Sequence, residues 1–235
     1  MFGDLRYWMI AAGLSLAACG GADRHGDWHD TIVRPDQFAL LPCNVDRAIP
    51  CTLVVAGGKR IQFGAPAGAG QGMRTEDLRQ LDAVMIFSLR AQEVEGLDEV
   101  RNLSWQAGRP EPLLVIGPPG LEDMVDALNK AFEQADALYV VEHGHPAGGY
   151  DAAILTARSA ARGQRVFDTG DLRVDRIPSG FRIIYGAEQL AELYDCHHAP
   201  DANADAVETE PTIRLTCTDG TGGQFWPIKA PIFVE

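Results

Sequence analysis

The stretch "DAVMIFSLRAQEVEGL", residues 82–97, carries the polar side chains that come nearest in type and spacing to a catalytic loop. An apolar run is followed at once by Ser88, Arg90, Gln92 and Glu93, and a Gly-Leu pair ends the stretch. A zinc site needs three or four strong donors, usually cysteine, histidine or carboxylate. The stretch holds no histidine, and Arg90 is a permanent cation without a lone pair to donate. The outline is that of a metal-binding loop, but the residues predict no metal centre.

Two other features could supply chemistry near this loop. His143 and His145 in "VVEHGHPAGG" would share one face if the segment were a strand, and could then bind metal together. Two histidines alone are an incomplete ligand set for a metal. A metal-free alternative would use Ser88 as a nucleophile, but no Gly-x-Ser-x-Gly elbow surrounds it and no histidine base is evident.

The N-terminal residues predict export. A short polar start is followed by an apolar run from Tyr7 to Ala18 and by the ending "LAAC" at Cys19. About twelve apolar residues are too few to span a bilayer, which needs roughly 20, and they fit a signal-peptide core. The ending resembles a bacterial lipobox. We therefore expect residues 1–18 to be a lipoprotein signal peptide and Cys19 to carry the lipid; the alternative is an ordinary signal peptide cut at an Ala-x-Ala-like site.

This leader predicts a protein of the bacterial cell envelope that binds the membrane through a lipid anchor. Gly20 rather than aspartate follows the cysteine, which favours the outer membrane, with the protein facing the periplasm. The formal net charge is -13. That sign repels phosphate backbones, so no nucleic-acid partner is expected.

The remaining cysteines predict disulfides. They are Cys43, Cys51, Cys196 and Cys217. An even number in an exported protein indicates two bridges with three alternative connectivities. We expect Cys43 to pair with Cys51 and Cys196 with Cys217, since the two cysteines of each pair flank one loop. A competing interpretation is a zinc site using Cys196, His197, His198 and Cys217, but adjacent histidines point apart and an oxidising compartment favours disulfides.

The elements that would position these residues follow from the apolar periodicity. Residues 19–38 are polar and mixed, and are interpreted as a tether. The next elements expected are a β-hairpin at 51–66, a glycine-rich loop at 64–73, a short helix at 74–81, strands at 83–87 and 112–117, and an amphipathic helix at 118–138. The glycine-rich loop lacks the spacing of a dinucleotide-binding turn, so we expect a tight loop that passes under a neighbouring site.

The second half of the chain predicts mostly strands. They are expected at 138–145, 165–177 and 180–186. The C-terminal segment, residues 187–235, is expected to contain a helix at 186–195, an acidic loop at 197–211 and a hairpin around residues 219–223. The predicted fold class is α+β, a layered sheet with helices outside, in a single domain over residues 39–235.

The order of these parts resembles the metallo-β-lactamase fold, closest to its ribonuclease Z-like branch. The resemblance is carried by "GGKRIQFGAPAGAGQGM", "LDAVMIFSLRAQEVEGL" and "RPEPLLVIGPPGLEDMVDAL". In that branch a strand runs into His-x-His-x-Asp-His and then Gly-Leu, and a later strand ends in Gly-Pro-x-Gly before a helix. Gly96-Leu97 and Gly117-Pro118-Pro119-Gly120 lie at those places. The resemblance implies an αββα-like layered sandwich, truncated, with the best match over residues 52–186.

On that frame the four ligand positions are Ser88, Arg90, Gln92 and Glu93, and each departs from the family residue. Only Pro178-Ser179 remains between two strands where the family carries another metal-binding histidine. The resemblance thus implies a degenerate site with vestigial positions. One hypothesis is that the Arg90 guanidinium takes the place of the metal cation, paired with Glu93, Asp168 or Asp171.

The main functional interpretation is a catalytically inactive metallo-β-lactamase-fold lipoprotein, a pseudoenzyme without cofactor. It would act as a binding or structural component of the envelope, with a groove for a small anion or for a loop of a partner protein. One alternative is a metal-dependent hydrolase, a ribonuclease Z-like phosphodiesterase or an esterase, whose zinc would be held by His143, His145, Glu93 and nearby acids. Another is a non-catalytic partner subunit of an active homologue.

Overall fold

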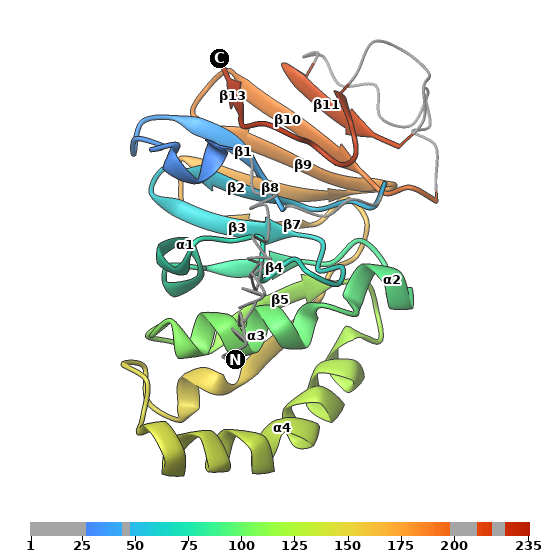
Figure 1. Cartoon of the computed structure of the whole chain (residues 1–235). Coiled ribbons are helices and arrows are strands. Elements are labelled where there is room, and N and C mark those ends of the chain that lie inside the picture. The colour runs from blue at the N-terminus through green and yellow to red at the C-terminus, as the bar shows by residue number, and fades with distance from the viewer. Residues whose placement is uncertain (1–26, 44–47, 198–210, 218–223) are drawn as a thin grey trace, which may run out of the picture.

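The computed structural model describes residues 27–43, 48–197, 211–217 and 224–235, and within them two β-sheets pack face to face (Figure 1). The first sheet has the order β13 (Ile232–Val234), β1 (Phe38–Pro42), β2 (Thr52–Ala56), β3 (Lys59–Phe63), β4 (Ala83–Met85), β5 (Leu113–Gly117), β6 (Leu155–Ser159). The second has the order β12 (Gln224–Phe225), β11 (Ile213–Thr216), β10 (Gln189–Tyr194), β9 (Gly180–Tyr185), β8 (Leu172–Ile177), β7 (Arg165–Asp168).

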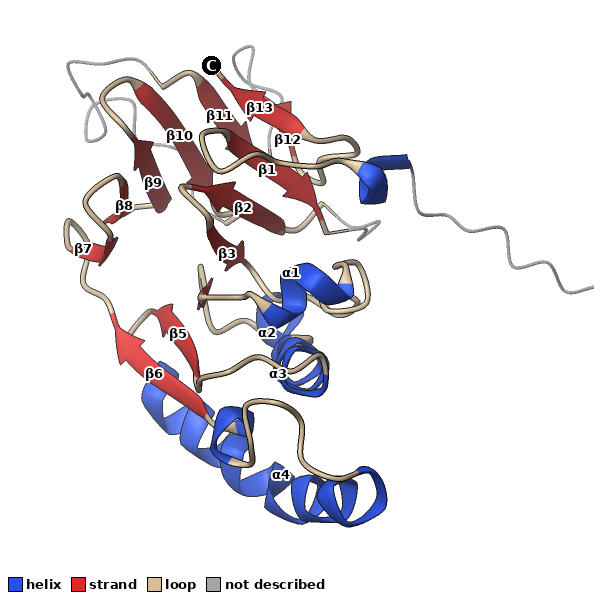
Figure 2. Cartoon of the chain, turned by 90° about the vertical axis from the view of Figure 1, so that its left-hand side faces the viewer, coloured by secondary structure: helices blue, strands red, loops and turns tan. Residues whose placement is uncertain are grey.

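The helices lie on the face of the first sheet that is turned away from the second (Figure 2). They are α1 (Thr75–Arg79), α2 (Ala91–Val94), α3 (Leu97–Gln106) and α4 (Leu121–His143), with short 3-10 turns at Asp27–Asp30 and Asp151–Ala153. Along β2, Leu53 and Val55 belong to the core under the helices, whereas Val54 and Ala56 belong to the core between the sheets. A strand buried on both faces reads as a continuous apolar run, which is why the sequence predicted it. The expected layered mixed α/β sandwich is confirmed.

Parallel strands bring the loops of interest to one edge. Strands β3, β4, β5 and β6 run parallel, so the segments that follow β4, β5 and β6 leave the first sheet at the same end. In the second sheet β8 and β10 both run antiparallel to β9, and their ends carry Arg176 and Asp195. Arg176 donates to the backbone oxygens of Ile86 and Phe87, which places the ends of β4 and β8 side by side.

The glycine-rich loop passes under this edge, as expected. Gly64 N donates to Met85 O at 2.8 Å, Ala65 N to Glu93 O at 3.1 Å, and Gly96 N to Ala65 O at 2.9 Å. A Cβ on Gly96 would lie 2.1 Å from the carbonyl oxygen of Pro66, so only glycine permits this approach. Close packing against the glycine-rich loop therefore explains the glycine of the Gly96-Leu97 pair.

The outer face of the second sheet carries a row of charged side chains. Arg165, Asp175, Arg182, Glu192 and Arg214 are register partners across five neighbouring strands, with alternating charge. Ion pairs join Arg165 to Asp175 at 3.0 Å, Arg182 to Glu192 at 2.7 Å, and Arg214 to Glu192 at 3.2 Å. Opposite charges facing each other across strands stabilise this face of the sheet, and Glu192, 1% exposed, is the buried member of the row.

Three of the sequence-based element predictions are wrong. The segment expected to be a strand at 138–145 is the last part of α4, because the three- and four-residue apolar spacing continues until Gly144, at φ 82°, ends the helix. The expected C-terminal helix at 186–195 contains β10, which pairs with β9 and β11. The expected closing hairpin is also wrong, since β11 and β12 pair in parallel. Most of the acidic loop, residues 198–210, lies outside the described residues.

The tether is shorter than predicted. Trp28 is 4% exposed and belongs to the core under the helices, and Phe38 already begins β1. The folded part of the chain therefore includes residues 28–38, which the sequence assigned to the tether. Residues 1–26, with Cys19, lie outside the described residues. None of the described helices has the length and apolar character needed to cross a membrane.

Candidate functional site

A pocket of about 480 Å³ opens where the strand ends of the two sheets meet. Its walls come from the loops after β4, β5, β6 and β8 and from the end of β10. Most of the wall is apolar, with Phe87, Leu89 and three prolines; Ser88, Arg162, Arg176 and Asp195 add polar groups. The Gly-Pro-Pro-Gly turn after β5 and the vestigial loop after β4 thus border the same space.

The structure brings one histidine to the vestigial positions. Glu93 is 1% exposed, and its Oε2 accepts a hydrogen bond from Ser88 Oγ at 2.9 Å. His197 Nε2 lies 3.1 Å from Glu93 Oε1 and 3.2 Å from Gln92 Nε2. His197 is 105 residues beyond Gln92 in the chain, so no local pattern could have joined them. Ser88, Gln92, Glu93 and His197 form what we call the Glu93 cluster.

The predicted role of Arg90 is wrong. Its side chain is exposed at the start of α2 and forms no ion pair with any described carboxylate. Asp168, one of its suggested partners, is paired instead with Arg165 at 3.2 Å, and the pKa of its carboxyl is lowered because it accepts the Gly170 N–H and lies beside Arg165. Asp171 likewise forms no ion pair with Arg90 in the described part of the chain.

Arg176 is the cation that approaches the Glu93 cluster. Its side chain enters the space between the sheets, and the residue is 8% exposed. Its Nη2 donates to Phe87 O at 2.7 Å and its Nη1 to Ile86 O at 3.4 Å, while the guanidinium lies 4.5 Å from the centre of the Phe181 ring. Burial lowers the pKa of Arg176 to about 10, against the opposing effect of Asp195 and Glu93. The group stays protonated at neutral pH.

The residues at the site do not fit the zinc that the fold implies. Glu93 is the one strong donor among the four ligand positions. Its Oε2 accepts from Ser88, and its Oε1 makes no hydrogen bond in the described part of the chain, with His197 Nε2 at 3.1 Å. The turn between β8 and β9 consists of Pro178-Ser179 alone, and Ile177 pairs with Gly180, which leaves no loop to bring a further histidine. No group of three or more His, Cys, Asp or Glu suited to a metal occurs among the described residues.

The weak metal candidates His143 and His145 are remote from the pocket. Helix α4 begins next to the Gly-Pro-Pro-Gly turn and runs for 23 residues, so its last residue lies roughly 30 Å away. The His143 ring stacks on Tyr139 with 4.6 Å between centroids, and its Nδ1 lies 3.2 Å from Tyr139 O. His143 therefore belongs to the end of a helix and cannot share ligands with Glu93.

The cysteines are placed for local disulfides. The Cα atoms of Cys43 and Cys51 are 5.7 Å apart, and those of Cys196 and Cys217 are 5.1 Å apart, with each pair at bonding distance. This geometry is incompatible with the zinc site suggested for Cys196 and Cys217, since disulfide sulfurs are not thiolate ligands. The bridge at Cys196 lies next to His197. His198 lies outside the described residues.

Sequence comparison identifies ribonuclease Z as a relative. The chain is 39% identical over 105 residues to the ribonuclease Z of Mycobacterium marinum, and 35% identical over 103 residues to that of Mycobacterium bovis. The first match covers 42% of this chain and 37% of the relative, so the chain matches only about a third of the length of these enzymes. No family model matches the sequence.

Structural comparison identifies the fold. The metallo-β-lactamase fold protein YhfI from Bacillus subtilis superimposes with a TM-score of 0.51, at 10% identity, over 77% of this chain and 70% of that one. Human tRNase Z, short form, also gives 0.51, at 14% identity, over 76% of each chain. The two sheets, the helix layer and the matched ribonuclease Z segment together identify a chain of metallo-β-lactamase fold with ribonuclease Z-like similarity.

Proposed function

We propose that this protein is a catalytically inactive metallo-β-lactamase-fold lipoprotein that binds a small ligand at the bacterial cell envelope. The observation that carries the proposal is the Glu93 cluster. At the positions where the fold holds metal ligands, a buried carboxylate is contacted by Ser88 and His197, with a buried guanidinium close by. Ser88 satisfies one oxygen of this carboxylate, whereas Glu93 Oε1, 3.1 Å from His197 Nε2, makes no hydrogen bond in the described part of the chain.

Catalysis has no evident agent in this arrangement. Hydrolysis by enzymes of this fold depends on a metal that polarises the substrate and activates water. A metal-free reaction through Ser88 would have to use the Glu93 carboxylate as its base, because the Ser88 hydroxyl donates to Glu93 and not to an imidazole. The pocket itself is retained, and its volume lies within the range of about 300–1,000 Å³ typical of small-molecule sites. Binding without turnover is the function that these features support best.

The location at the envelope rests on the sequence of residues 1–19. A lipid on Cys19 would hold the domain at the membrane surface, and the net charge of -13 would keep it from binding anionic lipid headgroups directly. We propose the outer membrane, with the domain in the periplasm. The local disulfide geometry suits that oxidising compartment.

A metal-dependent hydrolase is the second candidate, and it is favoured by the identity to ribonuclease Z over 105 residues. It would require a ligand set different from the family pattern, built around Glu93 and His197. Because the match covers 37% of the relative, an activity of the whole enzyme does not carry over to this chain without a test.

Metal analysis of residues 20–235 separates the two candidates. The purified protein should retain less than about 0.1 equivalent of zinc, manganese or iron after incubation with each ion and dialysis, because the donor set is incomplete. It should not hydrolyse a phosphodiester reporter such as bis(p-nitrophenyl) phosphate. Retention of about one equivalent that Glu93→Ala abolishes would establish the hydrolase candidate instead.

A further inference from the structure

We propose that Arg176 and Arg162 recognise the carboxylate of a monoanionic ligand whose apolar body fills the pocket between the two sheets. The inference deepens the proposed function, on which it rests, by naming the chemical class of the ligand. It is argued from the burial and contacts of Arg176, the balance of charge around the pocket and the character of its walls.

Arg176 is a buried cation without a direct counter-ion. No described carboxylate lies within 4.0 Å of its nitrogens, although the residue is 8% exposed. Buried charges are ordinarily paired, and two carbonyl oxygens with one aromatic face compensate a guanidinium only in part. The protein therefore holds a positive group at the wall of a cavity and leaves part of its charge for a ligand.

Arg109 shows what a purely structural buried arginine looks like in the same chain. Its Nε donates to Ser104 Oγ, its Nη2 to Ala152 O and its Nη1 to Glu111 O, so each nitrogen has a protein acceptor. Arg176 has two such bonds, to adjacent carbonyls, and its Nε donates to no described group. Each Nη also carries a second N–H. The planar fork of a guanidinium matches a carboxylate with two parallel hydrogen bonds.

A second arginine lies at the rim of the same pocket. Arg162 is exposed, lines the pocket, and forms no ion pair with a described carboxylate. It lies close enough to Arg176 to lower the pKa of that group. Two like charges held near each other without a direct partner repel, and an anion between them would relieve that repulsion.

The surrounding carboxylates favour a ligand with one negative charge over one with two. Asp195 lines the pocket and is 7% exposed, and Glu93, 1% exposed, accepts a hydrogen bond from the lining residue Ser88. Both favour the protonated form of Arg176, so both are close enough to act on a bound anion. A second negative charge on the ligand would add repulsion from these two carboxylates, whose own contacts include Ser88 and His197.

The apolar walls of the pocket favour a ligand that has an apolar part next to its charged group. Phe87, Leu89, Pro118, Pro119 and Pro178 line the pocket. Prolines contribute carbonyl oxygens but no N–H donors, so this part of the wall gives a polar ligand little to bind. A ring or a short branched chain carrying one carboxylate fits the volume of about 480 Å³ and the polarity together.

Benzoate, benzyl alcohol and phenyl phosphate test the charge requirement with one apolar ring. Binding to residues 20–235 can be followed by amide chemical-shift changes on titration. Benzoate should bind at least about tenfold more tightly than neutral benzyl alcohol, the effect expected of a charge-assisted hydrogen bond. Phenyl phosphate, a dianion at pH 8, should bind more weakly than benzoate. Equal affinity for benzoate and benzyl alcohol, or tighter binding of phenyl phosphate, would overturn the inference.

Three variants test the two arginines. Arg176→Lys keeps the charge but loses the planar fork, and should weaken benzoate binding at least about tenfold. Arg162→Gln should weaken it a few-fold, as expected for an exposed charge, and serves as the test if the first variant does not fold. Arg165→Gln is the matched control, because it removes an exposed arginine on the outer face of the second sheet and should leave the affinity unchanged.

The two proposals fail in different ways. If the protein retains a metal and still prefers benzoate through the arginines, the inactive assignment is wrong and the recognition site stands. If the protein is free of metal, and Arg162→Gln and Arg176→Lys bind benzoate as well as Arg165→Gln does, the carboxylate site is wrong and the inactive assignment stands.

Discussion

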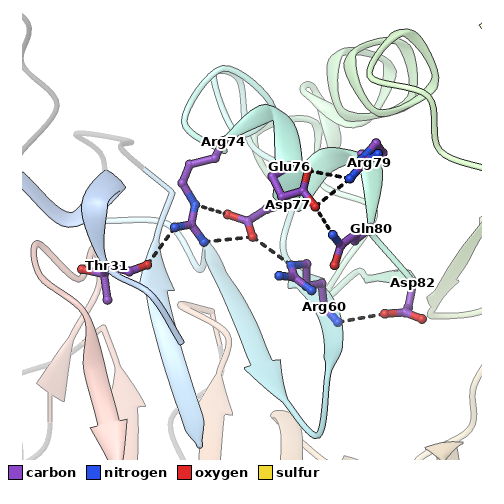
Figure 3. Close-up of polar contacts among 8 residues, drawn as sticks. All are labelled: Thr31, Arg60, Arg74, Glu76, Asp77, Arg79, Gln80 and Asp82. Carbon is purple, nitrogen blue, oxygen red and sulfur yellow. Dashed lines mark hydrogen bonds and ion pairs between the residues drawn. The ribbon is translucent and has the colours of Figure 1, made fainter. Parts of the chain in front are cut away.

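Asp77 holds three separate parts of the chain together through one buried carboxylate (Figure 3). It is fully buried in α1 and accepts hydrogen bonds from Arg60 Nε of β3 at 2.8 Å and from Arg74 Nε at 2.5 Å. Arg74 also donates from Nη1 to Thr31 O at 2.7 Å. The N-terminal segment, the first helix and a central strand are thereby fixed relative to one another.

The Asp77→Asn variant should lose about 3–5 kcal/mol of unfolding free energy, because it leaves two arginines without their buried counter-ion. Urea denaturation monitored by tryptophan fluorescence measures this. Glu76→Gln is the control on the same helix, since the Glu76–Arg79 pair is exposed on both sides. It should cost less than about 1 kcal/mol. Equal losses in the two variants would contradict the role assigned to Asp77.

At the scale of single residues, the sequence predicted the positions of the side chains at the site better than it predicted their contacts. Ser88 and Glu93 line or underlie the pocket region as expected from their position after a buried strand. His197 follows β10 and Arg176 lies in β8, and Arg176, not Arg90, is the buried cation near these residues. Local spacing cannot specify contacts between segments that are about a hundred residues apart.

At the scale of elements, α4 is anchored at its first turn to the end of β6. Ser159 N donates to Glu122 Oε1 at 2.6 Å, and Ser159 Oγ donates to Oε2. The Ser159 hydroxyl, together with backbone N–H donors, lowers the pKa of the Glu122 carboxyl below its usual value. In the middle of the helix, Asp136 pairs with Arg101 of α3 at 2.5 Å, with both side chains buried.

This anchor predicts a pH dependence with a defined sign. The pKa of Glu122 is lower in the folded chain than in the unfolded one, so the unfolded chain binds the proton first as pH falls. The stabilisation is present above the unfolded pKa of about 4.5 and is lost as pH falls through the folded value. Wild type should therefore lose more stability than Glu122→Gln between pH 6 and pH 3, measured by thermal unfolding.

The matched control for this experiment is Asp126→Asn, which removes an exposed carboxylate from the next turn of α4. It should follow the wild-type curve between pH 6 and pH 3. If Asp126→Asn and Glu122→Gln change the curve equally, the effect belongs to the net charge of the helix and not to the bond with Ser159.

The elements that were wrongly predicted share a physical reason. In β10, Leu190, Glu192 and Tyr194 alternate with Ala191 and Leu193, but the segment is rich in alanine, leucine and glutamate, which favour helices in isolation. Pairing with β9 and β11 overrides that preference. The valines near the end of α4 favour strands in isolation, yet extending an existing helix by one turn costs less than starting a new strand.

At the scale of the whole molecule, the position of Trp28 limits how far the domain can stand from a membrane. If Cys19 carries the lipid, residues 20–27 are the only connection to the buried Trp28. Nine peptide links reach at most about 30 Å, so the domain would stay close to the lipid surface. The acidic domain would be held there by its anchor, against the repulsion of anionic headgroups.

The anchor predicts that Cys19→Ser releases the protein. Expressed as the full chain in a Gram-negative host, the wild type should sediment with membranes and resist washing with high salt, because acyl chains are held by the hydrophobic effect and not by charge. The variant should appear in the soluble fraction. Retention of Cys19→Ser in salt-washed membranes would refute the lipid anchor.

The sequence by itself determined the layered fold class, the central strands, the glycine-rich loop under the site and the departure from the family's metal ligands. These depend on local properties, namely apolar periodicity, turn residues and donor chemistry, which residues carry wherever they lie. Only the tertiary structure decided that His197 contacts Glu93, that Arg176 and not Arg90 is the buried cation, and that the chain folds from Trp28 onward. Those outcomes depend on which strands pair and which strand ends lie at the same edge of the sheets. Burial and charge compensation arise only when these distant segments are packed against one another.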